Sequence, residues 1–265
     1  MTIGLYNTFF NETPWNDSLS TWFGASVSAI QLRSTKKLYE LQSIRKHSDV
    51  ARLIEEHDPD VLVLHELLPQ CVQEINTLLD EKYKFVDISD PSCNSVFPHT
   101  LLAISNRHEV DLDSFRPGRG VGDIAYGYIP DEKIAIIGCN PSAMSSRKRA
   151  AQLQNVADMA KLEQERGNSV LVIGDLNAER AEVDPFFESF SLQCIDKVPY
   201  PHEELYNQMQ EFPWQWLKHL MGLQNGQRYI DHIWMPDDWK IENIAQFKGL
   251  SDHYGVIVQA TVLRE

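Results

Sequence analysis

The chain has 265 residues, 43% of them apolar, and its 24 Lys and Arg against 38 Asp and Glu give a formal net charge of -14. This charge excludes a protein that wraps nucleic acid over its whole surface, because the long-range field repels phosphates. The apolar content suffices for a sizeable core in one large or two small domains. We expect one domain over 1–265, since no repeat, low-complexity segment or linker divides the sequence.

The sequence lacks the marks of export and of membrane insertion. No apolar run reaches the length of a membrane span, and the start, MTIGLYNTFF, has no basic region followed by an apolar core. Four widely spaced cysteines without a CxxC pair favour free thiols in a reducing compartment over disulfides or zinc ligands. We therefore expect a cytoplasmic protein without a membrane span.

Positive charge is concentrated in three segments of this acidic chain. Residues 31–52 contain six basic and two acidic side chains, a local net charge of +4. A second basic run lies at 147–149, and Arg116 and Arg119 flank a Pro-Gly turn. Each segment is either a solvated face or a surface that an anion approaches.

The N-terminal part predicts a strand, an insertion and surface helices. Residues 3–10 form an apolar run typical of an opening strand, with Asn7 as its one strongly polar interior residue. Residues 11–48 have no clean periodicity at their start, and we interpret them as an insertion. Helical spacing of apolar residues over 35–57 predicts one or two surface helices.

A second buried strand is predicted within residues 60–68, DVLVLHELL. Its carboxyl end delivers His65 and Glu66, which places a carboxylate at a strand end. The alternative for Glu66 is an acid in the first turn of a helix, where it interacts with the helix dipole. Residues 84–88 and 100–105 predict short strands.

The middle of the chain alternates strands with a helix. Strands are predicted at 123–128 and 133–139, and Asn140 follows the second of them directly. An apolar stripe predicts a helix over 145–165. Residues 170–173 are apolar with a β-branched bias, which is typical of a fully buried strand.

The turn after this buried strand carries Gly174, Asp175 and Asn177. The carboxylate can hold a metal or orient a water, and the amide can hydrogen-bond an anionic oxygen without adding repulsive charge. The alternative is a turn whose Asp and Asn cap the following helix. A short helix is predicted over 185–190.

The C-terminal part combines an aromatic segment with two polar interruptions of apolar runs. Residues 200–224 are rich in Tyr, Phe and Trp, and form either a lid or substrate wall or a loop packed onto the core. An Asp-His pair interrupts the predicted strand at 229–235. In 249–258 a Ser-Asp-His triplet precedes a strand; its alternative is a turn closed by the Asp side chain.

The polar residues at predicted strand ends are Asn7, His65-Glu66, Gly-Asp-x-Asn at 174–177, Ile-Asp-x-Ile at 230–233 and Ser-Asp-His at 251–253. This order resembles the endonuclease/exonuclease/phosphatase superfamily, the metal-dependent phosphodiesterases related to deoxyribonuclease I, which carry Gln-Glu where this chain has His-Glu. The matching residues span nearly the whole chain. The resemblance implies an α/β fold: a four-layer α/β/β/α sandwich, in which two packed mixed β-sheets are flanked by helices.

The resemblance also implies roles for single residues. Glu66 would be the principal ligand of Mg²⁺, or of Mn²⁺, with Asn7 and Asp252 near the metal; oxygen ligands of this kind suit a hard cation. The implied catalytic residues are Asp175, which orients or deprotonates the attacking water, Asn177, which hydrogen-bonds the phosphate, and His253, which Asp231 holds and which stabilises charge on the phosphoryl oxygens.

Two departures from the family pattern, and one agreement with it, affect the predicted site. Many members carry Thr-His-Leu before the long helix, where this chain has Cys-Asn-Pro; Asn140 can donate to a phosphate oxygen but cannot act as an acid. Arg147 and Arg149 lie where the family often has an Arg, which contacts phosphate or pairs with an acid. The family often has an acidic residue one or two positions after this Asn, but Thr8 and Phe9 follow Asn7 here. The number of metal ions therefore stays open.

These features predict a Mg²⁺-dependent phosphodiester hydrolase, a nuclease or DNA-end-processing phosphodiesterase that acts as a monomer on nucleic acid, DNA rather than RNA. The first alternative is a phosphoesterase for a phospholipid headgroup, an inositol phosphate or a small nucleotide, which the acidic balance favours. The second is a binding module without catalysis, which the joint retention of the polar residues disfavours.

Overall fold

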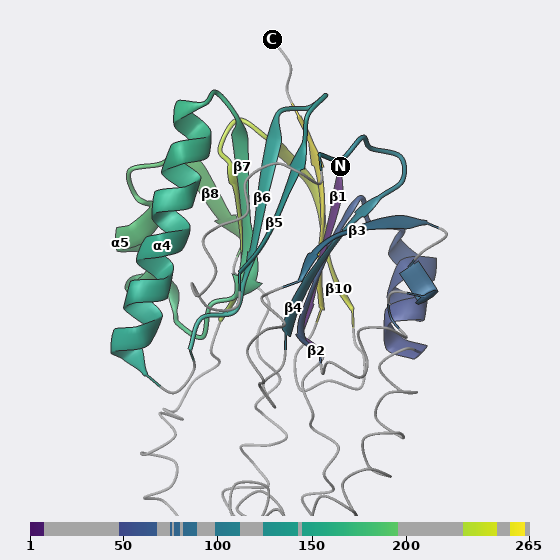
Figure 1. Cartoon of the computed structure of the whole chain (residues 1–265), viewed down its shortest axis with the longest axis horizontal. Coiled ribbons are helices and arrows are strands. Elements are labelled where there is room, and N and C mark those ends of the chain that lie inside the picture. The colour runs from purple at the N-terminus through teal and green to yellow at the C-terminus, as the bar shows by residue number, and fades with distance from the viewer. Residues whose placement is uncertain are drawn as a thin grey trace, which may run out of the picture.

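The computed structural model of the chain contains two β-sheets that lie face to face (Figure 1). The residues that the structure describes are 1–7, 48–67, 75, 77–79, 82–88, 99–111, 124–142, 145–195, 230–247 and 255–262. The elements in chain order are β1 (Thr2–Asn7), β2 (Val61–Leu67), β3 (Tyr83–Ile88), β4 (His99–Ser105), β5 (Ile124–Ile129), β6 (Ile134–Cys139), α4 (Ser146–Glu165), β7 (Ser169–Asp175), α5 (Arg180–Phe187), β8 (Leu192–Ile195), β9 (Asp231–Pro236), β10 (Lys240–Phe247) and β11 (Gly255–Thr261).

Both sheets are mixed. The first has the strand order β10-β11-β1-β2-β4-β3 and the second β5-β6-β7-β9-β8. The pairs β1–β2 and β6–β7 are parallel, whereas the other neighbours are antiparallel. The predicted pair of mixed sheets is therefore confirmed.

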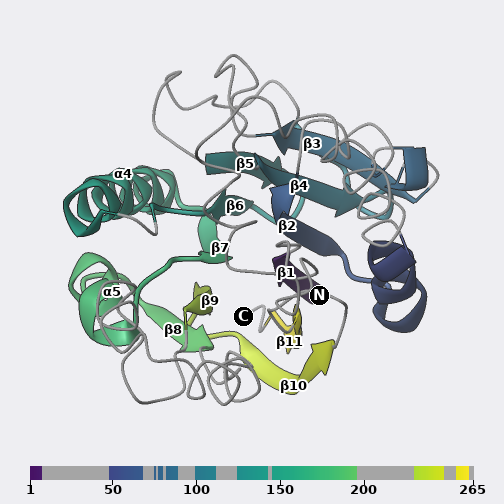
Figure 2. The same cartoon turned by 90° about the horizontal axis from the view of Figure 1, so that it is seen from below.

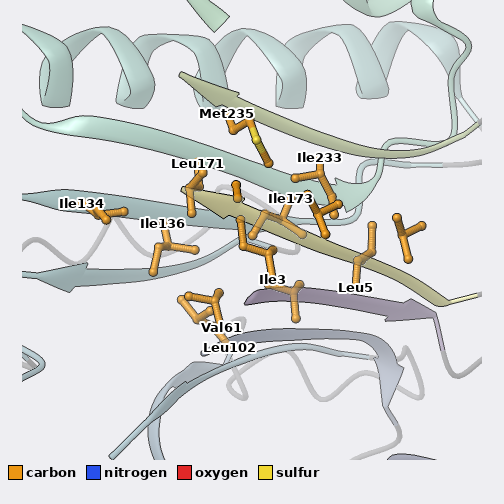
Figure 3. Packing of buried hydrophobic residues seen from close by; sticks show 14 of the residues in the cluster. Ile3, Leu5, Val61, Leu102, Ile134, Ile136, Leu171, Ile173, Ile233 and Met235 are labelled. Atoms are coloured by element: carbon orange, nitrogen blue, oxygen red, sulfur yellow. The ribbon is translucent and has the colours of Figure 1, made fainter. Parts of the chain in front are cut away.

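An apolar core fills the space between the two sheets. Side chains alternate between the faces of a strand, so Ile3 and Leu5 of β1 enter this core while Tyr6 packs on the outer side. A Cβ on Gly138 of β6 would lie only 3.2 Å from Val63 Cγ1, which shows how closely the sheets approach there. Figure 3 shows the facing side chains of the first sheet, Ile3, Leu5, Val61 and Leu102, and of the second, Ile134, Ile136, Leu171, Ile173, Ile233 and Met235.

Helices cover the outer faces of the sandwich (Figure 2). On the second sheet, α4 and α5 form a buried cluster that includes Leu153 and Val172. On the first, the helical residues 48–57 contribute Leu53 to a buried cluster that also contains Leu62. The predicted four-layer α/β/β/α order is thus confirmed. None of the helices within the described ranges is long and apolar enough to cross a membrane.

The predicted interruption of the strand near residue 231 is wrong, because Asp231 and His232 lie inside β9 and are buried. The imidazole of His232 is satisfied there: Nε2 lies 2.9 Å from the Ala178 carbonyl oxygen, and Nδ1 lies 3.6 Å from Cys194 Sγ. Since the carbonyl can only accept, Nε2 carries the proton and donates. Such partners allow a polar ring inside a buried strand.

One further local prediction is wrong, and two strands were missed. The helix predicted over 185–190 begins at Arg180 instead, because the Val183 N–H already donates to the Glu179 carbonyl and closes the first turn; Pro185 lies inside α5. The strands β8 and β10 were not predicted. β10, with the sequence KIENIAQF, is a mostly exposed edge strand without the apolar alternation of a half-buried one. The aromatic segment 200–224 and most of the insertion 11–48 lie outside the described residues.

Candidate active site

The carboxyl ends of the parallel strands meet at one end of the sandwich, toward which β1, β2, β6 and β7 all run (Figure 1). Thr100 of β4 joins the two sheets there. Its Oγ1 lies 2.9 Å from His65 Nδ1 on β2, and its Cγ2 lies 3.4 Å from the position that a Cβ on Gly138 of β6 would take. The strand ends that carry Asn7 and Asp175 therefore belong to the same end of the molecule.

The centre of the site is a hydrogen-bonded group around Asp175, the buried last residue of β7. The backbone N–H of Asn177 donates to Asp175 Oδ1 over 3.0 Å, which orients the carboxylate. Asn177 has a φ of 51°, a left-handed conformation that asparagine tolerates better than most residues. Its Nδ2 donates to Asn140 Oδ1 and to the Pro141 carbonyl, each over 2.9 Å, and so ties the ends of β6 and β7 together.

Helix α4 holds the turn 140–142 from the other side. The Ser142 N–H donates to Gln152 Oε1 over 2.8 Å, and Arg149 Nη1 donates to the Ser142 carbonyl over 3.1 Å. Arg149 Nη2 also pairs with Glu182 of α5 over 2.9 Å. Of the two alternatives for this arginine, pairing with an acid is the one observed, and these contacts lend no support to phosphate binding. Arg147 is exposed in the first turn of α4.

Gln152, Glu182 and Thr100 contribute to this arrangement and were not predicted. Gln152 and Arg149 are three residues apart on a helix, so they share a face. The apolar stripe of α4 marks its buried side. The spacing of Arg149 and Gln152 relative to this stripe was the one sequence signal that both polar side chains point inward. Thr100 and Glu182 act over long sequence separations, and nothing in their local sequence marks them.

Two buried carboxylates face each other across the β7–β9 pair. Asp175 and Asp231 are register partners and are only 1% and 4% exposed. Directly opposed residues in an antiparallel pair have Cβ atoms about 5 Å apart. Like charges at this distance in a low-dielectric interior favour a nearby cation or charged donor. The site chemistry therefore fits either a hard divalent cation or an imidazolium beside this pair.

The thiol of Cys139 lies next to this group and is buried. Its burial, and secondarily the negative charge of Asp175, raise the pKa of the Cys139 thiol far above its ordinary value. It therefore stays protonated at neutral pH and is a poor nucleophile. Among the described residues Cys139 and Cys194 are free thiols, as predicted.

The backbone of two predicted metal ligands, Glu66 and Asn7, lies at the expected strand ends. Glu66 is the next-to-last residue of β2 and Asn7 ends β1; neither side chain is within the described structure. Asp252 and His253 lie outside it, although β11, which starts two residues after His253, pairs with β1. Within the described ranges no three His, Cys, Asp or Glu residues gather as a metal site. The ligand set stays a prediction.

A comparison of the sequence with protein families identifies the chain. The profile described as the Endonuclease/Exonuclease/phosphatase family matches residues 34–253, most of its length. The chain belongs to the endonuclease/exonuclease/phosphatase family. Members of this family hydrolyse phosphoester bonds and generally use a divalent metal ion, typically Mg²⁺. The resemblance inferred from the sequence is thus confirmed. A comparison with curated protein sequences finds no significant match.

Solved structures share the fold of this endonuclease/exonuclease/phosphatase family member. Humanized D. rerio TDP2 superposes with a TM-score of 0.61 at 15% identity, covering 98% of each chain. D. rerio TDP2 in complex with a single-strand DNA product gives 0.59 at 14% identity, also with 98% of each chain. A Bacteroides thetaiotaomicron mannosyl-6-phosphatase gives 0.61 at 13% identity, with 98% of this chain and 99% of the other. At these identities the likeness shows the fold alone.

Proposed function

We propose that the protein is a Mg²⁺-dependent phosphodiester hydrolase that acts on nucleic acid, as a nuclease or a DNA-end-processing enzyme. The observation that carries this proposal is the oriented, buried Asp175 carboxylate beside a side-chain amide network, opposite a second buried carboxylate. A phosphodiester resists attack by water, so a catalyst must align the nucleophile and stabilise negative charge on the phosphoryl oxygens. The described residues supply candidates for both tasks.

In the proposed mechanism Asp175 orients the attacking water and accepts its proton. The Asn177 N–H holds one carboxylate oxygen, which limits the rotation of the base. Asn140 donates a hydrogen bond to a phosphate oxygen. His253, oriented by Asp231, adds positive charge near the same oxygens as the transition state forms.

We assign the metal to oxygen donors at the strand ends: Glu66 as the principal ligand, with Asn7 and Asp252 close to it. Carboxylate and amide oxygens suit Mg²⁺ or Mn²⁺, and two opposed buried carboxylates nearby favour positive charge in the site. When bound, the metal would neutralise charge on the phosphate. Orienting the water, accepting its proton and donating to the phosphate oxygens would fall to Asp175, Asn140 and His253.

The proposed substrate is supported by the exposed positive charge next to the site. Arg147 and Lys148 lie in the first turn of α4, just after the turn 140–142, and both are exposed in this acidic chain. The relative TDP2 has been solved with a single-strand DNA product. Arg147 and Lys148 are suited to bind a substrate phosphate one or two nucleotides away from the cleaved bond.

Replacing Arg147 and Lys148 together by alanine should weaken binding of single-strand DNA and lower the salt dependence of the binding constant. Each lost phosphate contact reduces the slope of log K against log salt by about 0.7. The measurement is fluorescence anisotropy over a range of salt concentrations. Lys161→Ala is the control, because Lys161 is an exposed lysine near the other end of the same helix. If Lys161→Ala and the double substitution have equal effects on binding, the first turn of α4 is not part of the DNA-binding surface.

A hydrolysis panel tests the proposed function. Its substrates are single-strand and duplex DNA, a 5′-tyrosyl DNA end, RNA, inositol phosphates, sphingomyelin and mannose 6-phosphate, each with Mg²⁺, with Mn²⁺ and with EDTA. We expect metal-dependent cleavage of a DNA substrate, lost in Asp175→Asn. Turnover of the sugar, inositol or lipid substrates alone would refute the nucleic-acid assignment.

The second candidate function is hydrolysis of a small phosphoester, a phospholipid headgroup, an inositol phosphate or a nucleotide. The net charge of -14 favours it, because a small substrate needs no extended basic surface. One structural relative is a mannosyl-6-phosphatase. The same Asp175 chemistry serves both candidates, so the panel separates them by substrate alone.

A further inference from the structure

A thiol and an imidazole meet on the face of the second sheet that the helices cover. Cys194 of β8 and His232 of β9 supply them, and Cys194 Sγ lies 3.6 Å from His232 Nδ1. His232 is fully buried, whereas Cys194 is partly exposed because β8 is an edge strand of its sheet. Neither group has a role in the proposed hydrolysis.

The second ring nitrogen of His232 decides the direction of this hydrogen bond. Nε2 lies 2.9 Å from the Ala178 carbonyl oxygen, which can only accept, so Nε2 carries the hydrogen of the neutral ring. Nδ1 then presents a lone pair, and the Cys194 S–H donates to it. A thiol, a base beside it and a third group that orients the base together make an activated nucleophile. His232 is therefore placed to take the proton of Cys194.

Trp234 lies directly opposite Cys194 in the β8–β9 pair. Both side chains pack in the same cluster, and residues opposed in this way have Cβ atoms about 5 Å apart. The indole is only 3% exposed, and its Nε1–H has no acceptor in the described part of the chain. A buried donor of this kind costs stability until it finds an acceptor. An oxygen atom added to the Cys194 sulfur would bring an acceptor to the residue that faces this indole.

We propose that Cys194 is an oxidation site, at which a hydroperoxide converts the thiol to a sulfenic acid with His232 as the base. Nδ1 of His232 takes the thiol proton, and the thiolate sulfur attacks one oxygen of the hydroperoxide. The S–O bond forms as the O–O bond breaks, so sulfur is oxidised and the peroxide oxygens are reduced. The leaving oxygen takes the proton back from His232 and departs, as water when the oxidant is hydrogen peroxide. Partial exposure of Cys194 suits such a small oxidant.

The test compares each cysteine in the native protein with the same cysteine in urea. The protein is treated with hydrogen peroxide for a set time, and catalase then removes the oxidant. Unfolding in the presence of dimedone traps the sulfenic acids, and peptide mass spectrometry measures the adduct at each cysteine. Cys139 is the internal reference, because burial and the charge of Asp175 raise the pKa of its thiol and keep it protonated.

We expect Cys194 to be oxidised about tenfold faster in the native protein than in urea, although unfolding exposes it fully. Cys139 should show the opposite order and react more slowly in the native protein. A thiol that is shielded and has no base reacts more slowly folded than unfolded. A native rate of Cys194 at or below its rate in urea would therefore overturn the proposal.

His232→Gln tests the base separately from exposure. Glutamine retains an N–H donor for the Ala178 carbonyl but has no basic nitrogen. We expect the native oxidation rate of Cys194 to fall by about tenfold, and an unchanged rate would overturn the role of His232. His108→Gln is the matched control, because its ring contacts Asp60 and Glu132 instead and the rate should stay the same. If His232→Gln does not fold, the comparison of native and unfolded wild type decides alone. None of these readouts needs hydrolysis, so the outcome is independent of the proposed function.

Discussion

Asp175→Asn should lower kcat for phosphodiester cleavage by about 10³-fold, equivalent to about 4 kcal/mol of transition-state stabilisation. The asparagine keeps an oxygen that accepts the Asn177 N–H, so the turn after β7 is retained. What is lost is the negative charge that accepts a proton from water. Steady-state kinetics with the substrate found in the panel measure the effect.

A second expected result concerns the thermal stability of Asp175→Asn. Asp175 and Asp231 face each other in a buried position, so removing one charge relieves their repulsion. In EDTA we expect Asp175→Asn to unfold at the same temperature as the wild type or at a higher one. The matched control is Asp158→Asn, the same change at an exposed position of α4, which should leave kcat unchanged. A residual rate in Asp175→Asn within tenfold of the wild type would exclude Asp175 as the base.

Gly174→Ala should cost about 3 kcal/mol or more in the free energy of unfolding. A Cβ at this position would lie 2.0 Å from the backbone carbonyl oxygen of Cys139 on the neighbouring strand. No flexible side chain can move aside to relieve this contact, so the end of β7 must separate from β6. Because Asp175 and Asn140 extend from these two strand ends, activity should fall together with stability. Urea denaturation followed by circular dichroism measures the loss.

Gly138→Ala is the matched control for this substitution. It adds the same methyl group one residue before Cys139, where the nearest atom is Val63 Cγ1 at 3.2 Å. A valine side chain can shift by a few tenths of an ångström, so we expect a cost of about 1 kcal/mol. Equal destabilisation by the two alanines would mean that the strand ends yield easily and that Gly174 has no special role in placing Asp175.

The sequence was most informative where a buried strand ends in a polar residue. The run before Asp175 is apolar on both faces because helices cover one side of the second sheet and the first sheet covers the other. The same reasoning located β2 and β6, and the order of the polar residues indicated the family. Periodicity also placed α4 to within a residue of its observed start.

The parts that sequence reasoning missed depend on contacts between distant segments. His232 looked like an interruption because its acceptor, the Ala178 carbonyl, lies 54 residues earlier in the chain. The role of Arg149 depends on Glu182, which comes from a different helix. Whether an Asn or Arg near a strand end meets substrate or protein is decided by such partners, and local propensity carries no information about them.

The proposed mechanism requires that oxygen ligands at the strand ends hold a metal on which Asp175-dependent hydrolysis depends. The most direct test is the rate of cleavage of the preferred phosphodiester by EDTA-treated protein as Mg²⁺ is added back, for the wild type and for Glu66→Gln. We expect no cleavage in EDTA, a saturable recovery with Mg²⁺ in the wild type, and a recovery in Glu66→Gln that needs a much higher Mg²⁺ concentration. Cleavage that persists in EDTA, or the same Mg²⁺ dependence in both proteins, would contradict a metal held by Glu66.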